Sequence, residues 1–296
     1  MQKNTYLIKD LENLTGIKAH TIRIWEVRHN LLNPLRTATN IRQYSEEDLK
    51  KILNINLLYG NGYKISKIAN LSATEIIDKA SELIALKQKE TPIEIKNLME
   101  AILKMNTDKM QLILNDVFDK RGIIILYMEV ITPVLKRIGE LWQLGTVNIA
   151  QEHIFSNALR EFIITISNGL TKPRIGKKVM LCLPEREEHE LPLLFYQYLL
   201  RDKGWECFYL GQRVPFTDIQ KSYHKIEPDM VITSMIQSTT PKQFSYSLDK
   251  ILSAVPPEKL CLSGCNTISY YDQIPKAVST IHCLSDFDNI FSNKSS

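Results

Sequence analysis

Apolar residues in the first third of the chain recur at helical spacing and are separated by turn residues. A first helix, ending near Thr15-Gly16, is predicted by the spacing of Leu7, Ile8, Leu11 and Leu14. A second helix over about residues 18–29 buries Ile22 and shows a polar, largely basic face made of His20, Thr21, Arg23 and Arg28. Two short helices joined by a turn that contains glycine predict a helix-turn-helix.

The next segment predicts a two-stranded wing and a further helix. Arg36 and Arg42 flank a polar loop with Asn40 at its tip, and asparagine tolerates a positive φ better than most residues. Ser45, followed three residues later by Asp48, is an acidic variant of the capping box and predicts a helix start. Residues 1–76 are therefore predicted to be a winged helix-turn-helix domain.

The middle of the chain is predicted to be helical throughout. Residues 77–92 form a helix and a charged linker that ends at Pro92, and residues 93–172 hold four apolar helices that predict an antiparallel bundle. Thr132-Pro133 predicts that the third helix kinks or restarts there. His153 follows Glu152 on or near the apolar stripe of the fourth helix. The pattern alone leaves two interpretations open, a core histidine with a hydrogen-bond partner or a ligand.

Residues 173–296 change to alternating strands and helices. Five apolar strand-like runs separated by helices predict a doubly wound parallel sheet of the flavodoxin-like kind, so the whole chain is expected to be multidomain α and α/β. Such sheets bind ligands beyond the carboxyl ends of their strands. There, in PEREEHELPLL, stands His189, with Glu187 two residues earlier. It is either a ligand oriented by the acid or part of an acid-rich first helical turn.

Charge and composition add a cellular context to this organisation. The net charge of +4 lies entirely in residues 1–75, which hold 11 Lys and Arg against 7 Asp and Glu. A basic head on a neutral body fits nucleic-acid binding, although a solvated basic face is the alternative. No apolar run is long enough to span a bilayer and no signal-peptide core is visible, so we expect a cytoplasmic protein without a membrane partner.

The cysteines and the other potentially reactive residues do not form a pattern typical of an enzyme. The five cysteines all lie beyond residue 181, form no C-x-x-C pair and mostly fall in apolar runs, so we expect buried thiols and neither disulfides nor a zinc site. No glycine-rich phosphate loop and no nucleophile with an evident base is visible. We therefore expect a protein without catalytic residues.

The first 70 residues resemble the winged-helix DNA-binding domain of the MerR family. TIRIWEVRHNLLNPLRTATNIRQYSEEDL is similar to the family pattern T-[IL]-R-x-[WY]-E, L-x-P-x-R and G-x-R-x-Y-[ST]-x-x-D-[LV], with Asn40 in place of the wing glycine. The resemblance implies that the polar face of the second helix meets the major groove and its phosphates. It also implies that the wing is placed against the DNA backbone by Arg36, Arg42 and Tyr44.

The remainder resembles the cobalamin-binding module of the MerR-like, light-responsive CarH and LitR repressors. Trp142, Glu152 and His153 match W-x9-E-H, and Glu187 and His189 match the start of [DE]-x-H-x-x-G. The resemblance implies that His189 is the lower axial ligand of cobalt and that Trp142 shelters the adenosyl group of adenosylcobalamin. It implies that Glu152 and His153 lie above the corrin and that His153 takes the cobalt after photolysis. The nucleotide tail would be held near two strand-end residues, Ser234 and Gly264.

Two departures from this motif leave a choice of function. Pro192 replaces the motif glycine, and Ser263 precedes Gly264 where the family often has two glycines. The first hypothesis is a repressor whose adenosylcobalamin-driven homo-oligomer, a dimer or tetramer, binds double-stranded operator DNA. The second is a similar regulator whose C-terminal module answers to another ligand or an antagonist protein. The third, a corrinoid carrier for methyl transfer, is disfavoured by the basic winged helix.

Overall fold

The computed structural model describes residues 5–86, 91–237 and 239–292. The chain divides into two units, residues 1–158 and 159–296, and each is described by itself. The predicted fold class is confirmed, because a helical head and bundle precede a parallel five-stranded sheet. The division between the units falls inside a helix, so the domain boundaries expected at residues 76, 92 and 172 stay predictions.

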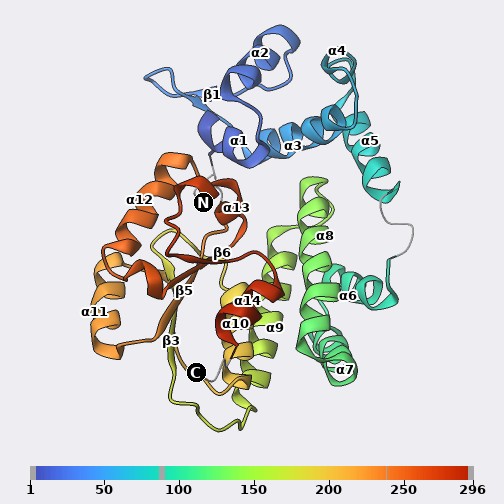
Figure 1. Cartoon of the computed structure of the whole chain (residues 1–296). Coiled ribbons are helices and arrows are strands. Elements are labelled where there is room, and N and C mark those ends of the chain that lie inside the picture. The colour runs from blue at the N-terminus through green and yellow to red at the C-terminus, as the bar shows by residue number, and fades with distance from the viewer. Residues whose placement is uncertain (1–4, 87–90, 238, 293–296) are drawn as a thin grey trace. The chain divides into compact units, whose positions relative to one another are not determined.

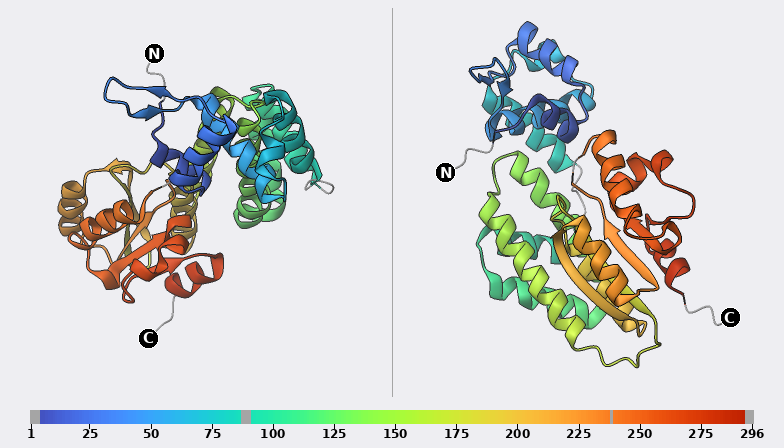
Figure 2. Two further views of the ribbon diagram at one scale, coloured as in Figure 1. Left: turned by 90° about the horizontal axis from the view of Figure 1, so that it is seen from above. Right: turned by 90° about the vertical axis from the view of Figure 1, so that its left-hand side faces the viewer.

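The first unit begins with a winged helix-turn-helix, here called the head (residues 5–86). Its elements in chain order are α1 (Ile8–Thr15), α2 (Ala19–His29), β1 (Leu35–Arg36), β2 (Arg42–Gln43), α3 (Glu46–Gly60), α4 (Ile65–Ile68) and α5 (Ala73–Leu86). Gly16 ends α1 in the left-handed conformation, as its position predicted. Asn40 has a φ of 63° at the tip of the wing. In Figure 2 the wing is a hairpin that extends beyond the helices of the head.

Local capping and a shared core explain why these elements form. The Ser45 hydroxyl accepts from the Asp48 backbone N–H at 3.1 Å, and the Asp48 carboxylate accepts from the Ser45 N–H at 2.9 Å. Ile22 and Trp25 of α2 are buried in one cluster with apolar residues of α1 and α3. The opposite face of α2 is thereby left toward solvent.

The bundle helices follow, and the helical backbone is interrupted at Gly122 and not at Thr132-Pro133 as predicted. They are α6 (Ile93–Leu103), α7 (Thr107–Ile125), the π-helical turn η1 (Leu126–Ile131), α8 (Thr132–Gln143) and α9 (Ile149–Asn168). The chain breaks at Gly122, whose φ of 75° and ψ of 171° are not helical, and stays helical through Thr132-Pro133. Pro133 cannot donate to the preceding turn, and the wider π turn of η1 accommodates its ring without a restart.

The start of α9 is fixed by local hydrogen bonds, and it corrects one expectation. Asn148 and Gln151 exchange hydrogen bonds of 2.9 Å each between side chain and backbone, which caps the helix. The expectation that His153 lies on or near the buried stripe is wrong, since its side chain is 66 % exposed. Phe155 is buried instead, and two residues correspond to about 200° around a helix.

The second unit is a flavodoxin-like α/β domain. Its strands are all parallel in the order β4-β3-β5-β6-β7, with bounds β3 (Lys178–Pro184), β4 (Glu206–Val214), β5 (Met230–Ser234), β6 (Leu260–Ser263) and β7 (Ser279–Ile281). One face carries α10 (Leu191–Asp202) and α14 (Leu284–Phe291), and the other carries α11 (Phe216–Ile226) and α12 (Pro241–Leu252) (Figure 1). The order reverses at β3, where open sheets bind ligands. Short helices complete the domain at Pro257–Lys259, Cys265–Ser269 (α13) and Tyr271–Gln273.

The cysteine expectation is corrected in part. Cys182 and Cys261 are buried within strands and Cys207 is half-buried, but Cys265 and Cys283 are exposed because each follows the end of a strand. All five cysteines are free thiols. Within the ranges that the structure describes, no helix combines the length and apolar character needed to cross a membrane.

Candidate functional sites

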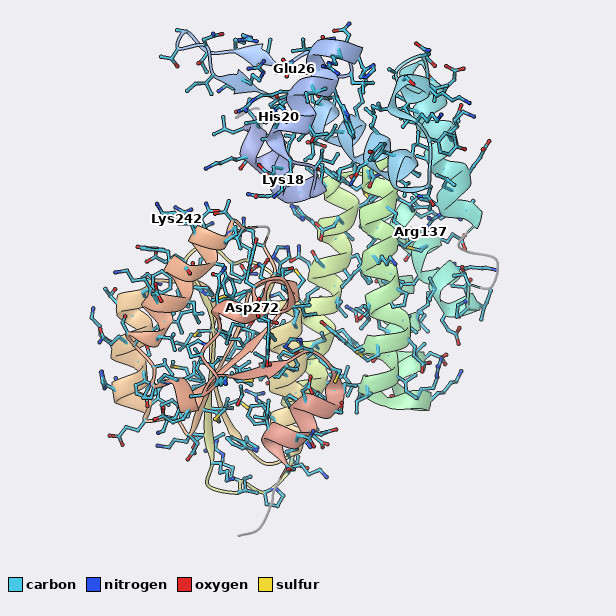
Figure 3. The ribbon with its side chains drawn as sticks, turned by 45° about the horizontal axis from the view of Figure 1, so that its top comes forward. Lys18, His20, Glu26, Arg137, Lys242 and Asp272 are labelled. Atoms are coloured by element: carbon cyan, nitrogen blue, oxygen red, sulfur yellow. The ribbon has the colours of Figure 1, made fainter. Side chains whose placement is uncertain are left out.

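The solvent-facing side of α2 carries most of the residues expected to meet DNA. His20, Arg23 and Arg28 are exposed and Thr21 is half-buried, while Ile22 and Trp25 anchor the helix from behind. Figure 3 marks His20 and Glu26 on this helix and Lys18 just before it. The structure therefore places a polar and basic surface on the second helix of the helix-turn-helix.

The sequence reasoning missed Val27 on the same surface. Its side chain is 76 % exposed, the largest value among the exposed large apolar residues of the described chain. It lies one helical turn beyond Arg23 and so extends the face that His20 and Arg23 begin. A break in the apolar spacing of α2 was the available signal, because Val27 does not align with Ile22 and Trp25.

The wing is tied to α2 by a polar cluster of Glu26, Arg42 and Tyr44. The Arg42 Nε donates to the Glu26 carboxylate at 3.0 Å, and the Tyr44 hydroxyl donates to it at 3.1 Å. The Tyr44 side chain is fully buried, and burial together with the Glu26 carboxylate raises its pKa. Tyr44 thus supports the wing from inside the head and does not reach the surface.

Arg36 is the exposed arginine of the predicted wing pair. Its Nη1 donates to the Asn40 side-chain oxygen at 2.6 Å across the hairpin, which holds the guanidinium at the tip of the wing. Arg42 in contrast is mostly covered by its ion pair with Glu26. The two arginines therefore differ in role, although their spacing in the sequence is symmetric about the loop.

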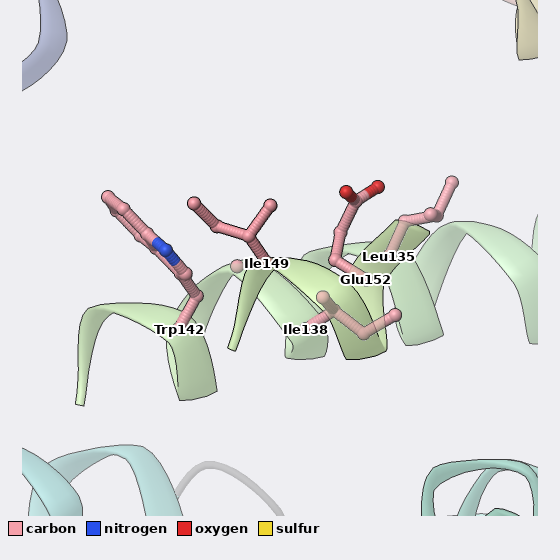
Figure 4. Close-up of a pocket in the computed structure, with 6 residues that line it drawn as sticks. Leu135, Ile138, Trp142, Ile149 and Glu152 are labelled. Atoms are coloured by element: carbon pink, nitrogen blue, oxygen red, sulfur yellow. The ribbon is translucent and has the colours of Figure 1, made fainter. Parts of the chain in front are cut away.

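In the bundle, the structure brings Trp142 and Glu152 to the same small pocket. The pocket has a volume of about 290 Å³, and its lining residues are Leu135, Ile138, Gly139, Trp142, Ile149 and Glu152. The α8 members recur at helical spacing, and the start of α9 supplies the rest. In Figure 4 the labelled side chains of Trp142, Ile149 and Glu152 point to the same side. The result is an apolar wall with one carboxylate at its edge.

His153 is joined to this wall through Glu152. Its Nδ1 lies 2.6 Å from Glu152 Oε2, and the imidazole is largely in solvent. His153 is not among the pocket-lining residues. The interpretation of His153 as a core histidine is therefore wrong, and its role as a ligand stays a prediction.

In the second unit, Glu187 holds His189 in the loop after β3. The Glu187 side chain is 5 % exposed, and its Oε1 lies 2.5 Å from His189 Nδ1 while accepting from the backbone N–H of His189 at 3.0 Å. Its Oε2 accepts from the backbone N–H groups of Ile236 and Gln237, at 2.7 Å each. One buried carboxylate therefore joins the loops that follow β3 and β5.

The electrostatics of this carboxylate define how His189 presents its ring. Burial by itself would raise the pKa of Glu187, but hydrogen bonds from the His189 ring and from backbone N–H groups outweigh it and lower the pKa. An ionised carboxylate only accepts hydrogen bonds, so His189 Nδ1 carries the proton and donates. Nε2 is then the nitrogen suited to coordinate a metal.

The strand ends beside this loop hold buried hydroxyl groups. Ser234 ends β5 and is completely buried, and its Oγ has no hydrogen-bond partner within the described part of the chain. A buried hydroxyl without a partner is costly, which makes it a candidate for contact with a bound polar group. Ser263, at the end of the neighbouring strand β6, is buried as well.

The local backbone explains why glycine is present at position 264 and why proline is tolerated at position 192. A Cβ at Gly264, where φ is 99°, would lie 2.5 Å from the Met235 carbonyl oxygen, so the turn after β6 requires glycine. Pro192 lies in the first turn of α10, where a backbone N–H has no intrahelical partner to lose. The residue before that helix, Glu190, accepts from Tyr209 and from Arg160, at 2.7 Å each.

Two family models and two repressors match this chain in sequence. Residues 6–75 match the MerR HTH family regulatory protein and residues 94–166 match the B12 binding domain. The chain is 29 % identical over 263 residues to the HTH-type transcriptional repressor CarH of Myxococcus xanthus, covering 86 % of this chain and 87 % of that protein. It is 24 % identical over 262 residues to the repressor CarA of the same organism, covering 88 % and 86 %.

A solved structure has a similar fold over about two thirds of the chain. The monomethylamine corrinoid protein of Methanosarcina barkeri superposes with a TM-score of 0.53 at 13 % identity, covering 65 % of this chain and 94 % of that one. At this identity the likeness concerns the fold alone. The two family matches confirm the predicted resemblance of the head to MerR regulators and of the bundle to the B12 binding domain.

Proposed function

We propose that this chain is a transcriptional repressor that binds operator DNA and senses adenosylcobalamin, because it matches the MerR HTH and B12 binding families and is similar over most of its length to the repressor CarH. The observation that carries the sensing role is the buried Glu187 carboxylate, which fixes the His189 ring beside the switch point of the sheet. The corrin would supply the cobalt, and the His189 imidazole would hold it. Imidazole nitrogen is a suitable cobalt ligand when it is neutral.

The residues present fit the cofactor in both units. In the second unit, His189 would ligate the cobalt, and the unpartnered Ser234 hydroxyl would contact the nucleotide tail. In the first unit, Trp142 and its apolar neighbours would contact the adenosyl group, with Glu152 at the edge. His153, whose imidazole is oriented by Glu152, would be a second candidate residue to hold the cobalt. Adenosylcobalamin itself supplies a cobalt–carbon bond that light can cleave.

DNA binding is assigned to the head. The α2 surface of His20, Thr21, Arg23 and Arg28 would enter the major groove, and Arg36 would contact a phosphate from the wing. The ligand favours DNA binding if it binds an assembled dimer or tetramer more tightly than the single chain. Assembly then multiplies the DNA contacts through effective concentration.

The test is DNA binding by the full chain with and without adenosylcobalamin, in the dark and after illumination. We expect retention of the chromophore through gel filtration, retardation of operator DNA in the dark, and loss of retardation after light. A protein that binds DNA but retains no chromophore would remove the sensing role and leave the regulator.

Pro192 favours a second candidate, a regulator of the same type that is controlled by another ligand or by an antagonist protein. The proline adds bulk and removes an N–H in the first turn of α10, where the family motif has glycine. The variant Pro192→Gly decides between the two candidates. If it gains cobalamin binding that the wild-type chain lacks, the natural chain has lost the cofactor.

A further inference from the structure

We propose that Lys50 and Asn54 of α3, in the DNA-binding head, are positioning residues for Trp142 and therefore for the upper side of the cobalamin site. This inference rests on the proposed function. The two side chains lie four residues apart on one face of α3, and both contact the C-terminal turn of α8. Neither residue belongs to a motif of the bundle or of the sheet.

Asn54 makes the most specific contact. It is 2 % exposed, its Nδ2 donates to the Gln143 carbonyl at 3.2 Å, and its Oδ1 accepts from Gln143 Nε2 at 2.9 Å. A buried amide in the middle of a helix is tolerated only where such partners satisfy it. The reciprocal pair therefore sets how α3 and the end of α8 meet, directly beside Trp142.

Lys50 covers the tryptophan itself. Its Nζ lies 5.0 Å from the centre of the Trp142 ring, within the range of a cation–π interaction, and an ion pair with Glu46 at 2.9 Å holds the ammonium. Trp142 also packs against the apolar cluster of the head. The head thus supports one part of the indole through charge and packing.

Another part of the same indole lines the pocket that contains Glu152. Trp142 therefore belongs to two surfaces, the contact with α3 and the wall proposed for the adenosyl group. Because α3 shares its core with α2 of the helix-turn-helix, a shift of Trp142 is coupled to the element that would carry DNA recognition. Such a coupling is reciprocal, so DNA and ligand would each change the affinity for the other.

The experiment compares Lys50→Met and Asn54→Leu with Lys51→Met, a matched control on the next residue of α3. The full chain is titrated in the dark with adenosylcobalamin and, separately, with cyanocobalamin, whose upper ligand is small. For Lys50→Met we expect adenosylcobalamin affinity to fall about two- to five-fold relative to the control. Cyanocobalamin affinity should stay unchanged, and Lys50→Arg, which keeps a cation over the ring, should restore the preference.

A second readout needs no cofactor. Amide hydrogen exchange over residues 138–145 is measured in the ligand-free chain, and Asn54→Leu should accelerate it while Lys51→Met should not. If both variants match the control in exchange and in the ratio of the two cobalamin affinities, the inference is wrong. If the wild-type chain binds neither cobalamin, the proposed function fails first and the inference fails with it.

Discussion

Glu187 shows how much one residue decides in this protein. A carboxylate that is nearly inaccessible to solvent is stable here only because it accepts from the His189 ring and from backbone N–H groups of two loops. It fixes the proton on His189 Nδ1 and joins β3 to β5 at the switch point of the sheet. The orientation of the His189 ring, which is the proposed cobalt ligand, and the stability of its loop therefore depend on the same carboxylate.

Glu187→Gln should lower the free energy of unfolding by about 1.5–3 kcal/mol at neutral pH, because an amide nitrogen would face donors that need an acceptor. The pKa of Glu187 is lowered in the folded chain. Its stabilisation is therefore complete above the unfolded-state pKa of about 4.3 and lost as the pH falls through the folded value. Urea unfolding between pH 7 and pH 3 measures this, and the acid-dependent loss should be smaller in the variant. Glu188→Gln, on the exposed neighbour, should behave as wild type.

Val27 is a second single residue with a testable role, because we predict that its side chain contacts a thymine methyl group. An exposed valine beside Arg23, on the side of α2 proposed to enter the major groove, is the apolar partner that a thymine methyl there requires. Replacing the contacted thymidine by deoxyuridine in a selected operator should weaken binding about fourfold, the value of one buried carbon. Val27→Ala should bind both duplexes alike, and Leu112→Ala, an exposed apolar residue of α7, should keep the discrimination. Equal binding of both duplexes by the wild-type chain would contradict the assignment.

At the scale of elements, the wing illustrates why spacing does not reveal role. Arg36 and Arg42 flank the loop symmetrically, yet the second is drawn inward because Glu26 of α2 pairs with it and with Tyr44. Spacing likewise failed to locate the helix break, because the helix is interrupted at Gly122 and the π turn before Pro133 accommodates the proline ring.

Substitutions of the two wing arginines should therefore have different effects on DNA binding and on thermal stability. Arg36→Ala should weaken DNA binding and reduce the slope of log affinity against log salt by about one, with no change in thermal stability. Arg42→Ala should lower thermal stability as well, because it leaves the Glu26 carboxylate without its ion-pair partner. Salt-dependent retardation and thermal unfolding of the two variants test this. Equal stabilities would show that the Glu26 cluster does not support the wing.

For the whole molecule, the expected consequence of ligand binding is assembly. Adenosylcobalamin in the dark should raise the sedimentation coefficient of the chain, and illumination should reverse the change. His189→Ala should prevent the increase, because the proposed cobalt ligand is lost. His224→Ala, the same substitution at an exposed histidine of α11, should assemble normally. An increase that persists in His189→Ala would show that the ligand is held in another way.

The sequence by itself determined the elements and their class. Helical and strand periodicity, the Ser45 and Asn148 caps and the alternation after residue 176 depend on interactions between near neighbours, which a local pattern records. The motif positions Trp142, Glu152, Glu187 and His189 were visible in the sequence through its resemblance to the cobalamin-binding module.

Only the tertiary structure decided which of these side chains are buried and which meet. The exposure of His153, the inward turn of Tyr44 and the reach of Glu187 to Ile236 and Gln237 all depend on groups distant in sequence. So does the pairing of Asn54 with Gln143, 89 residues away. The physical reason is that burial and long-range hydrogen bonding are properties of packed surfaces, and no periodicity within one segment specifies the surface that will cover it.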